Sequence, residues 1–133
     1  MPSIHIPTDR STYEGEIATY WIDNGILISL SKSAKRTVEN LTGNVALVKQ
    51  ITHNTRMPLL IYLSNSPVPD KAAQQYAREQ VSVIYSAMAM ISKPGLAKFI
   101  MNLLFSFKPP PIPMKSFSDE VKAKQWLQQF IKT

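Results

Sequence analysis

The chain contains no cysteine, and this absence excludes several classes of protein. Without a thiol there is no disulfide framework, no cysteine-based zinc site or iron–sulfur cluster, and no cysteine nucleophile. The only two histidines, His5 and His53, lie far apart in the sequence. A metal site usually gathers three or four ligands. The sequence therefore predicts neither a metal site nor another cofactor.

Glycine is also scarce, and its placement argues against nucleotide chemistry. The four glycines, at positions 15, 25, 43 and 95, form neither a dinucleotide-binding fingerprint nor a P-loop. No nucleophile elbow is present, although a Ser–His–acid triad assembled from distant segments stays open. The close acidic pairs Glu14/Glu16 and Asp119/Glu120 each fall within one short segment, unlike the paired carboxylates of hydrolases. We expect a protein that is not an enzyme.

Long apolar runs are missing too. The N-terminal residues lack the basic start and apolar core of a secretion signal. The most apolar stretch, residues 81–107, is interrupted by serine, lysine, proline and asparagine, whereas a membrane-spanning helix needs about 20 nearly uninterrupted apolar residues. These features favour a cytoplasmic protein.

Positive charge, in contrast, is in excess. Fifteen lysines and arginines stand against nine acidic residues, which gives a net charge of +6. The basic residues are spread from Arg10 to Lys132, and Lys35-Arg36 is the only adjacent pair. No aromatic residues are interleaved with a basic run, as a groove for single-stranded nucleic acid would need. The pattern indicates a solvated basic surface and disfavours a nucleic-acid partner.

The order of hydrophobic segments predicts one α/β domain. Residues 1–14 are polar and aperiodic, which predicts a flexible arm before a domain at 15–133. Asn24-Gly25 supplies the tight turn of a β-hairpin. The expected elements are strands 17–22 and 26–30, a helix from about 37 to 53, strand 59–63, helix 71–80, strand 87–91, helix 96–106, strand 114–117 and a helix from 118 to 131. A hairpin followed by this alternation implies a mixed, mainly parallel sheet with helices packed against it.

Short segments near the C-terminus carry a resemblance to a known family. They read Lys108-Pro109-Pro110, Phe117-Ser118-Asp119-Glu120 and Trp126-Leu127. Together with the element order, they make residues 17–131 resemble the STAS domain, whose best-known members are anti-sigma-factor antagonists with the SpoIIAA-like fold. The chain is most similar to small uncharacterised bacterial STAS-like proteins. The resemblance implies a bacterial protein with a SpoIIAA-like fold.

The segment after the third expected strand departs from the family pattern. In the antagonists it reads approximately Asp-Leu-Ser-Gly-Val-x-x-Ile-Asp-Ser-Ser-Gly-Leu, and one of the paired serines is phosphorylated. Without gaps, Asp70 aligns with the second aspartate, and Lys71 and Ala72 stand where the paired serines belong. The resemblance therefore implies a module that lacks the usual phosphoacceptor. Ser64 and Ser66, in the preceding loop, are the alternative acceptors.

Apolar side chains around helix 96–106 allow two interpretations. Met101 and Phe105 fall outside the stripe that begins at Leu96 and Phe99. With Phe107, they form either part of the core or an exposed apolar patch for a partner, a second copy of the chain or a lipid.

Two functional hypotheses follow. The first is a non-enzymatic regulatory or scaffold module that acts through protein–protein contact, including self-association as a dimer. Its candidate contact surface comprises Ser64, Ser66, Asp70, Lys71, Met101, Phe105 and Phe107. The second is a carrier or sensor of an apolar ligand or lipid with peripheral membrane contact, because Lys93, Lys98 and Lys108 lie beside the apolar helix.

Overall fold

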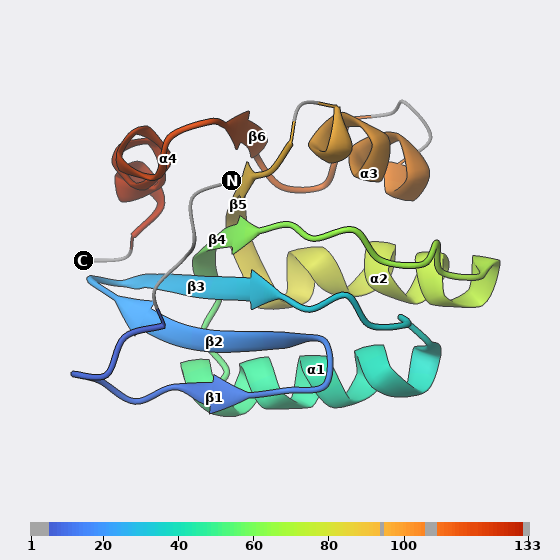
Figure 1. The fold of residues 1–133 in the computed structure, drawn as a ribbon, viewed down its shortest axis with the longest axis horizontal. Helices are drawn as coiled ribbons and strands as arrows, with labels where there is room; N and C mark the ends of the chain where they lie inside the picture. The colour runs from blue at the N-terminus through green and yellow to red at the C-terminus, as the bar shows by residue number, and fades with distance from the viewer. Residues whose placement is uncertain (1–5, 94, 106–108, 132–133) are drawn as a thin grey trace.

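A computed structural model of the protein describes residues 6–93, 95–105 and 109–131. Its centre is a six-stranded sheet in which every strand lies next to its neighbour in sequence, in the order β1-β2-β3-β4-β5-β6 (Figure 1). The strands are β1 (Tyr13–Glu14), β2 (Ala18–Asp23), β3 (Ile26–Ser31), β4 (Met57–Tyr62), β5 (Tyr85–Ile91) and β6 (Met114–Phe117). The first three strands pair antiparallel and the pairs from β3 to β6 are parallel. The predicted mixed, mainly parallel α/β fold is confirmed.

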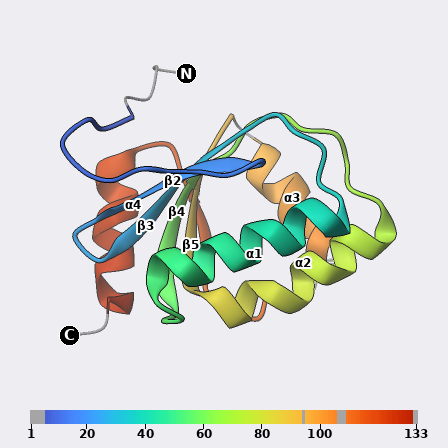
Figure 2. The same cartoon turned by 90° about the horizontal axis from the view of Figure 1, so that it is seen from below.

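The first three helices connect the parallel strands, the fourth follows the last strand, and together they form two layers. They are α1 (Val38–Thr52), α2 (Lys71–Ile84), α3 (Leu96–Phe105) and α4 (Glu120–Leu127), which continues into the 3₁₀ turn Gln128–Phe130. Figure 2 shows α1, α2 and α3 on one side of the sheet and α4 on the other. Right-handed crossovers between successive parallel strands normally place their helices on one face, as for α1, α2 and α3, whereas α4 follows β6 and belongs to no crossover.

The core follows the alternation of side chains along the strands. Tyr20 and Leu27 face α1 and α2, while their neighbours Trp21 and Ile28 face α4. Because successive side chains in a strand point to opposite faces, both faces of the sheet carry buried apolar residues. Leu127 of α4 is fully buried against the second face.

Turn and capping chemistry explains where several elements begin. Asn24 (φ 50°) and Gly25 (φ 84°) adopt positive φ in the β2–β3 hairpin, as the Asn-Gly signal predicts. Thr37 caps α1 by accepting from the Asn40 amide at 3.0 Å. Such a side chain satisfies an amide that has no partner inside the helix.

Two boundaries differ from the sequence prediction. Helix α2 continues to Ile84 instead of ending near Gln80, because Val81 and Ile84 bury their side chains against the sheet. This tertiary burial outweighs the β propensity of the segment. The expectation of a loose arm does not hold for Tyr13–Glu14, which pair with β2.

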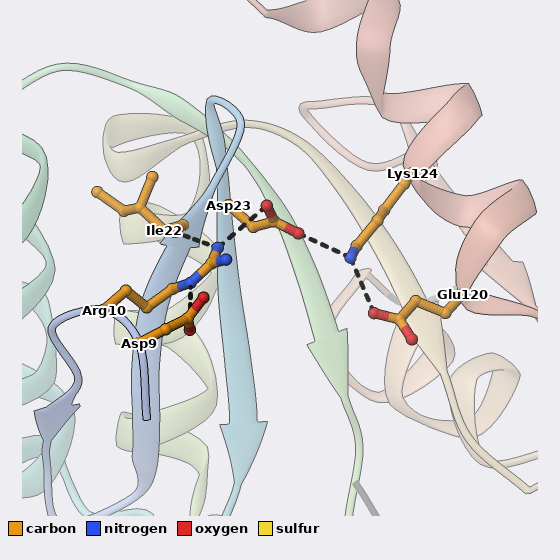
Figure 3. A network of polar contacts seen from close by, with 6 residues as sticks. All are labelled: Asp9, Arg10, Ile22, Asp23, Glu120 and Lys124. Carbon is orange, nitrogen blue, oxygen red and sulfur yellow. Dashed lines mark hydrogen bonds and ion pairs between the residues drawn. The ribbon is translucent and has the colours of Figure 1, made fainter. Parts of the chain in front are cut away.

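A polar network also ties the N-terminal segment to the body of the fold (Figure 3). Arg10 donates to Asp23 at 3.1 Å, and Asp23 accepts from Lys124 of α4 at 2.9 Å. Lys124 also pairs with Glu120 one helical turn earlier, at 2.9 Å. The N-terminal segment, the hairpin and α4 are thereby joined on one side of the molecule.

Over the described part of the chain, no helix combines the length and the apolar character needed to cross a membrane. The longest helix, α1, has 15 residues.

Candidate functional site

A polar cluster lies where β3 and β4 end. Ser31 is the last residue of β3, Arg36 belongs to the connection from β3 to α1, and Ser64 and Ser66 lie in the loop after β4. Because β3 and β4 are parallel, their carboxyl ends meet at the same edge of the sheet. Ligands of open α/β sheets commonly bind at this edge.

Arg36 is the centre of the cluster. Its guanidinium donates hydrogen bonds to five acceptors: the Nη1 atom to the Lys32 carbonyl (2.8 Å), the Ala34 carbonyl (2.6 Å) and Ser66 Oγ (2.7 Å), and the Nη2 atom to the Ile17 carbonyl (3.3 Å) and Ser31 Oγ (2.6 Å). These bonds connect the β3–α1 segment with the loop after β4. Arg36 therefore holds two loops together at the carboxyl edge of the sheet.

All five acceptors of Arg36 are neutral. Within the described residues, no carboxylate lies at ion-pair distance from its guanidinium. The nearby Lys32 differs, because its ammonium pairs with Glu14 Oε2 at 2.7 Å. Partial burial removes water from Arg36 and lowers the pKa of its guanidinium. The cluster thus contains a desolvated positive charge that is hydrogen-bonded but not neutralised.

The loop after β4 has further anchors. Ser64 Oγ donates to Ser31 Oγ at 3.3 Å, and Ser66 Oγ donates to the Lys32 carbonyl at 3.4 Å. Ser33 Oγ donates to the Asn65 carbonyl. The two predicted site residues Ser64 and Ser66 are therefore half-buried members of a hydrogen-bonded cluster.

The start of α2 completes this edge. Asp70 caps the helix by accepting from the Ala73 amide at 2.8 Å, so its carboxylate has a structural role. Asp70 and Lys71 are both exposed. Just before them, the side chain of Val68 is 59% exposed. The structure places Ser64, Ser66, Asp70 and Lys71 along one continuous segment.

Sequence reasoning missed Arg36 and Val68 as members of this region. Arg36 belongs to the only adjacent basic pair, but the pair by itself does not indicate burial. Its burial depends on contacts with residues up to thirty positions later in the chain. Val68 stands between two prolines, a context that indicates a loop without indicating its surroundings.

The predicted patch on α3 needs correction. Phe105 is only 8% exposed, so the core interpretation is correct for Phe105 and its place among the candidate surface residues is not. Met101 is half-buried against a cluster that contains Leu63 and Met90, and Phe99 is 51% exposed. Phe107 lies outside the described residues.

The orientation of α3 explains this correction. Ala97, Met101 and Phe105, spaced four residues apart, form the inward stripe. Arg78 of α2 also donates to the Leu104 carbonyl at 3.2 Å, which fixes the end of α3 against α2. Almost every position in α3 is apolar, so hydrophobic spacing alone did not select the correct stripe.

A separate pocket of about 500 Å³ lies beside α1. Its lining residues are Glu14, Gly15, Glu16, Glu39, Asn40, Gly43, Asn44 and Leu47. Asn44 is oriented by the buried Tyr20 hydroxyl, which donates to Asn44 Oδ1 at 2.7 Å. None of the predicted site residues lines this pocket. The described residues contain no group of three histidine or acidic side chains arranged to hold a metal ion.

The comparisons with known proteins agree with this architecture. A family model described as domain of unknown function DUF7793 matches residues 20–131. The chain belongs to this DUF7793 family. The match begins within β2 and includes strands β3 to β6 and all four helices. No curated protein matches the chain.

A solved structure supplies the name of the fold. The chain is similar to an uncharacterised protein of the DUF3478 family with a SpoIIAA-like fold from Shewanella loihica PV-4. The TM-score is 0.60, the sequence identity is 18%, and the match covers 88% of this chain and 97% of the other. The predicted SpoIIAA-like fold is confirmed.

Proposed function

We propose that the protein is a non-enzymatic regulatory or scaffold module that acts through contact with another protein. The contact surface is the segment 64–71, hereafter the β4–α2 segment. The observation that carries the proposal is the exposed Val68 side chain on a loop whose two preceding serines, Ser64 and Ser66, are hydrogen-bonded to Ser31 and Arg36.

The physical argument rests on preorganisation. A loop that is already held in one conformation loses little conformational entropy when a partner binds it. The hydrogen bonds of Arg36, Ser33 and Ser64 hold the β4–α2 segment in this way. An exposed apolar side chain on such a loop suits an apolar pocket of a partner. The charges of Asp70 and Lys71 beside it favour one orientation of that partner.

The experiment compares three tagged proteins in cells of the native host. Wild type, Val68→Asp and Val121→Asp are captured under identical conditions and their bound proteins are quantified by mass spectrometry. Val121 is a matched control because it is 61% exposed on α4, in the opposite helical layer. We expect one partner that is retained by wild type and Val121→Asp and lost by Val68→Asp.

A partner bound equally by all three proteins would contradict the proposed surface. Size-exclusion chromatography with light scattering on the same proteins tests self-association. A dimer that Val68→Asp dissociates would identify the partner as a second copy of the chain.

A second candidate function is supported by α3. The Phe99 side chain is 51% exposed next to the exposed Lys98, a combination that favours an anionic lipid surface. Under this proposal the protein carries or senses an apolar ligand with peripheral membrane contact. Sedimentation with vesicles containing anionic lipid tests it. Wild type and Val121→Ser should sediment with the vesicles, and Phe99→Ser should remain in solution. Equal sedimentation of all three proteins would contradict the proposal that α3 is the membrane-contacting surface.

A further inference from the structure

Hydrogen-bond donors remain unmatched in the Arg36 cluster. Ser31 Oγ accepts from Arg36 and from Ser64, and its own hydrogen has no acceptor among the described residues. The Arg36 Nε–H likewise has no acceptor within that part of the chain. The groups that remain available for a ligand are therefore donors. A ligand that matches them must present acceptors.

The positive charge of the cluster also favours a ligand that presents acceptors, and in particular an anion. Lys32, Lys124 and Arg10 pair with carboxylates, whereas Arg56 and Arg78 donate to the carbonyls of Tyr85 and Leu104. Arg36 is bonded only to carbonyl and hydroxyl oxygens. Holding a partly desolvated cation without a counter-charge costs free energy, and a bound anion would offset that cost.

We propose that Arg36 and Ser31, with Ser66 holding Arg36 in place, form a binding site for a small oxyanion, a free phosphate or carboxylate group. An oxyanion offers only acceptors, which the Ser31 hydroxyl and Arg36 Nε require. Hydrogen bonds from a guanidinium to an oxyanion are charge-assisted and stronger than those to neutral oxygens. The site does not depend on the proposed protein partner, because it is complete within one chain.

The position of the cluster supports access by a ligand. Ser31, Arg36 and Ser66 are each half-buried, so they remain in contact with solvent. They gather from three separate segments at the carboxyl edge of the parallel strands. Ser66 is bonded to Arg36 and to the Lys32 carbonyl, so an anion that draws Arg36 toward itself would also act on the β4–α2 segment.

The test is a titration of the ¹⁵N-labelled full chain with inorganic phosphate, followed by NMR at constant ionic strength maintained with sodium chloride. We expect saturable chemical-shift changes confined to residues 31–36 and 64–66. Acetate titrated in the same way distinguishes a carboxylate ligand from a phosphate. Saturable binding of either anion at these residues supports the proposal, and binding of neither overturns it.

Three variants establish which groups bind. Arg36→Lys keeps the charge but loses the planar fork, so the affinity should fall about tenfold or more. Ser31→Ala removes the free hydroxyl and should weaken binding by about threefold to tenfold. Lys35→Met is the matched control, because it removes an exposed positive charge from the adjacent position. Its affinity should remain within about twofold of wild type, since an exposed charge is screened.

Several outcomes would overturn the proposal. One is a set of shift changes scattered over the surface lysines. Another is a loss of affinity in Lys35→Met as large as in Arg36→Lys, because this would indicate general attraction to positive charge. If Arg36→Lys loses the dispersed spectrum of a folded protein, Ser31→Ala decides the question, and an unchanged affinity in that variant rejects the site.

Discussion

Asp23 and Lys124 are separated by 101 positions in the sequence, yet Asp23 Oδ2 and Lys124 Nζ lie 2.9 Å apart. Asp23 ends β2 at the hairpin, and Lys124 lies in the last helix. Arg10 approaches the other oxygen of the same carboxylate at 3.1 Å. One side chain therefore links the N-terminal segment and α4 to the turn between β2 and β3.

This link predicts a pH-dependent contribution to stability. Hydrogen bonding and charge attraction from Lys124, followed by Arg10, hold the pKa of Asp23 below its ordinary value of 3.8. Because the pKa is lower in the folded state, the contribution is present above the unfolded value and is lost as the pH falls through the folded value. Asp23→Asn should reduce the free energy of unfolding by about 0.5 to 1 kcal/mol at neutral pH, since the pair is partly exposed and screened.

The measurement is urea denaturation at pH 7 and at a pH below the folded pKa of Asp23. The difference between Asp23→Asn and wild type should shrink at the acidic pH. Glu16→Gln serves as a comparison for general loss of negative charge, because Glu16 is exposed and forms no ion pair within the described residues. A difference between wild type and Asp23→Asn that stays constant with pH would show that the ion pair does not contribute.

The two phenylalanines of α3 predict opposite sensitivities to truncation. Phe105 is buried and Phe99 is mostly exposed. Phe105→Ala should lower the free energy of unfolding by about 3 kcal/mol, because it removes buried apolar area and leaves a cavity. Phe99→Ala should change it by less than about 1 kcal/mol. Chemical denaturation of both variants provides the measurement. The reverse order of stabilities would mean that α3 is turned the other way.

Alanine substitutions at two glycines that line the pocket beside α1 should have opposite effects on the stability of the protein. Gly43 lies inside α1 without a positive φ, and a Cβ there would meet no atom within 4 Å. Gly43→Ala should stabilise the protein by about 0.5 to 1 kcal/mol, because alanine favours helix and glycine does not. At Gly15 a Cβ would lie 2.9 Å from Leu47 Cδ2 and 3.1 Å from the Ala18 carbonyl oxygen. Gly15→Ala should therefore destabilise it.

Thermal unfolding of the two glycine variants provides the comparison, with a higher Tm for Gly43→Ala and a lower Tm for Gly15→Ala than wild type. A drop in Tm for Gly43→Ala would indicate that the pocket side of α1 is more crowded than the structure implies.

Leu127 tests the layer that α4 forms. Its side chain is fully buried among residues of β3, β4 and β5. Leu127→Ala should cost about 2 to 5 kcal/mol of unfolding free energy. Hydrogen exchange on the same variant should show faster exchange in α4 than in α1, which packs on the other face. Equal acceleration in both helices would indicate that the two layers do not respond separately.

The fold could be predicted from the sequence wherever a local signal fixes the backbone. Asn24-Gly25 identifies the hairpin, and Thr37 and Asp70 mark helix starts, because turn and capping chemistry acts within a few residues. The stripe of α3 could not be predicted in this way, since its apolar residues surround most of the helix. The end of α2 depended on burial against strands elsewhere in the chain.

In the candidate site, too, the features set by local sequence could be predicted and those set by distant contacts could not. The loop of the β4–α2 segment and the start of the following helix were predicted from the sequence, because both depend on local features. Arg36 was not, since its surroundings come from Ile17, Ser31 and Ser66, which only the folded sheet brings together. Sequence spacing does not reveal a cation whose partners are mostly carbonyl and hydroxyl groups from distant positions.

The sequential strand order has a consequence for synthesis on the ribosome. Each strand from β2 to β6 pairs with the strand made just before it, so the sheet can grow in the direction in which the chain emerges. One face of the sheet is not covered as the strands are added. It carries Trp21 and Ile28 and is covered by α4, which is synthesised after all six strands. During translation this face stays uncovered the longest, and it is where a nascent chain would engage a chaperone.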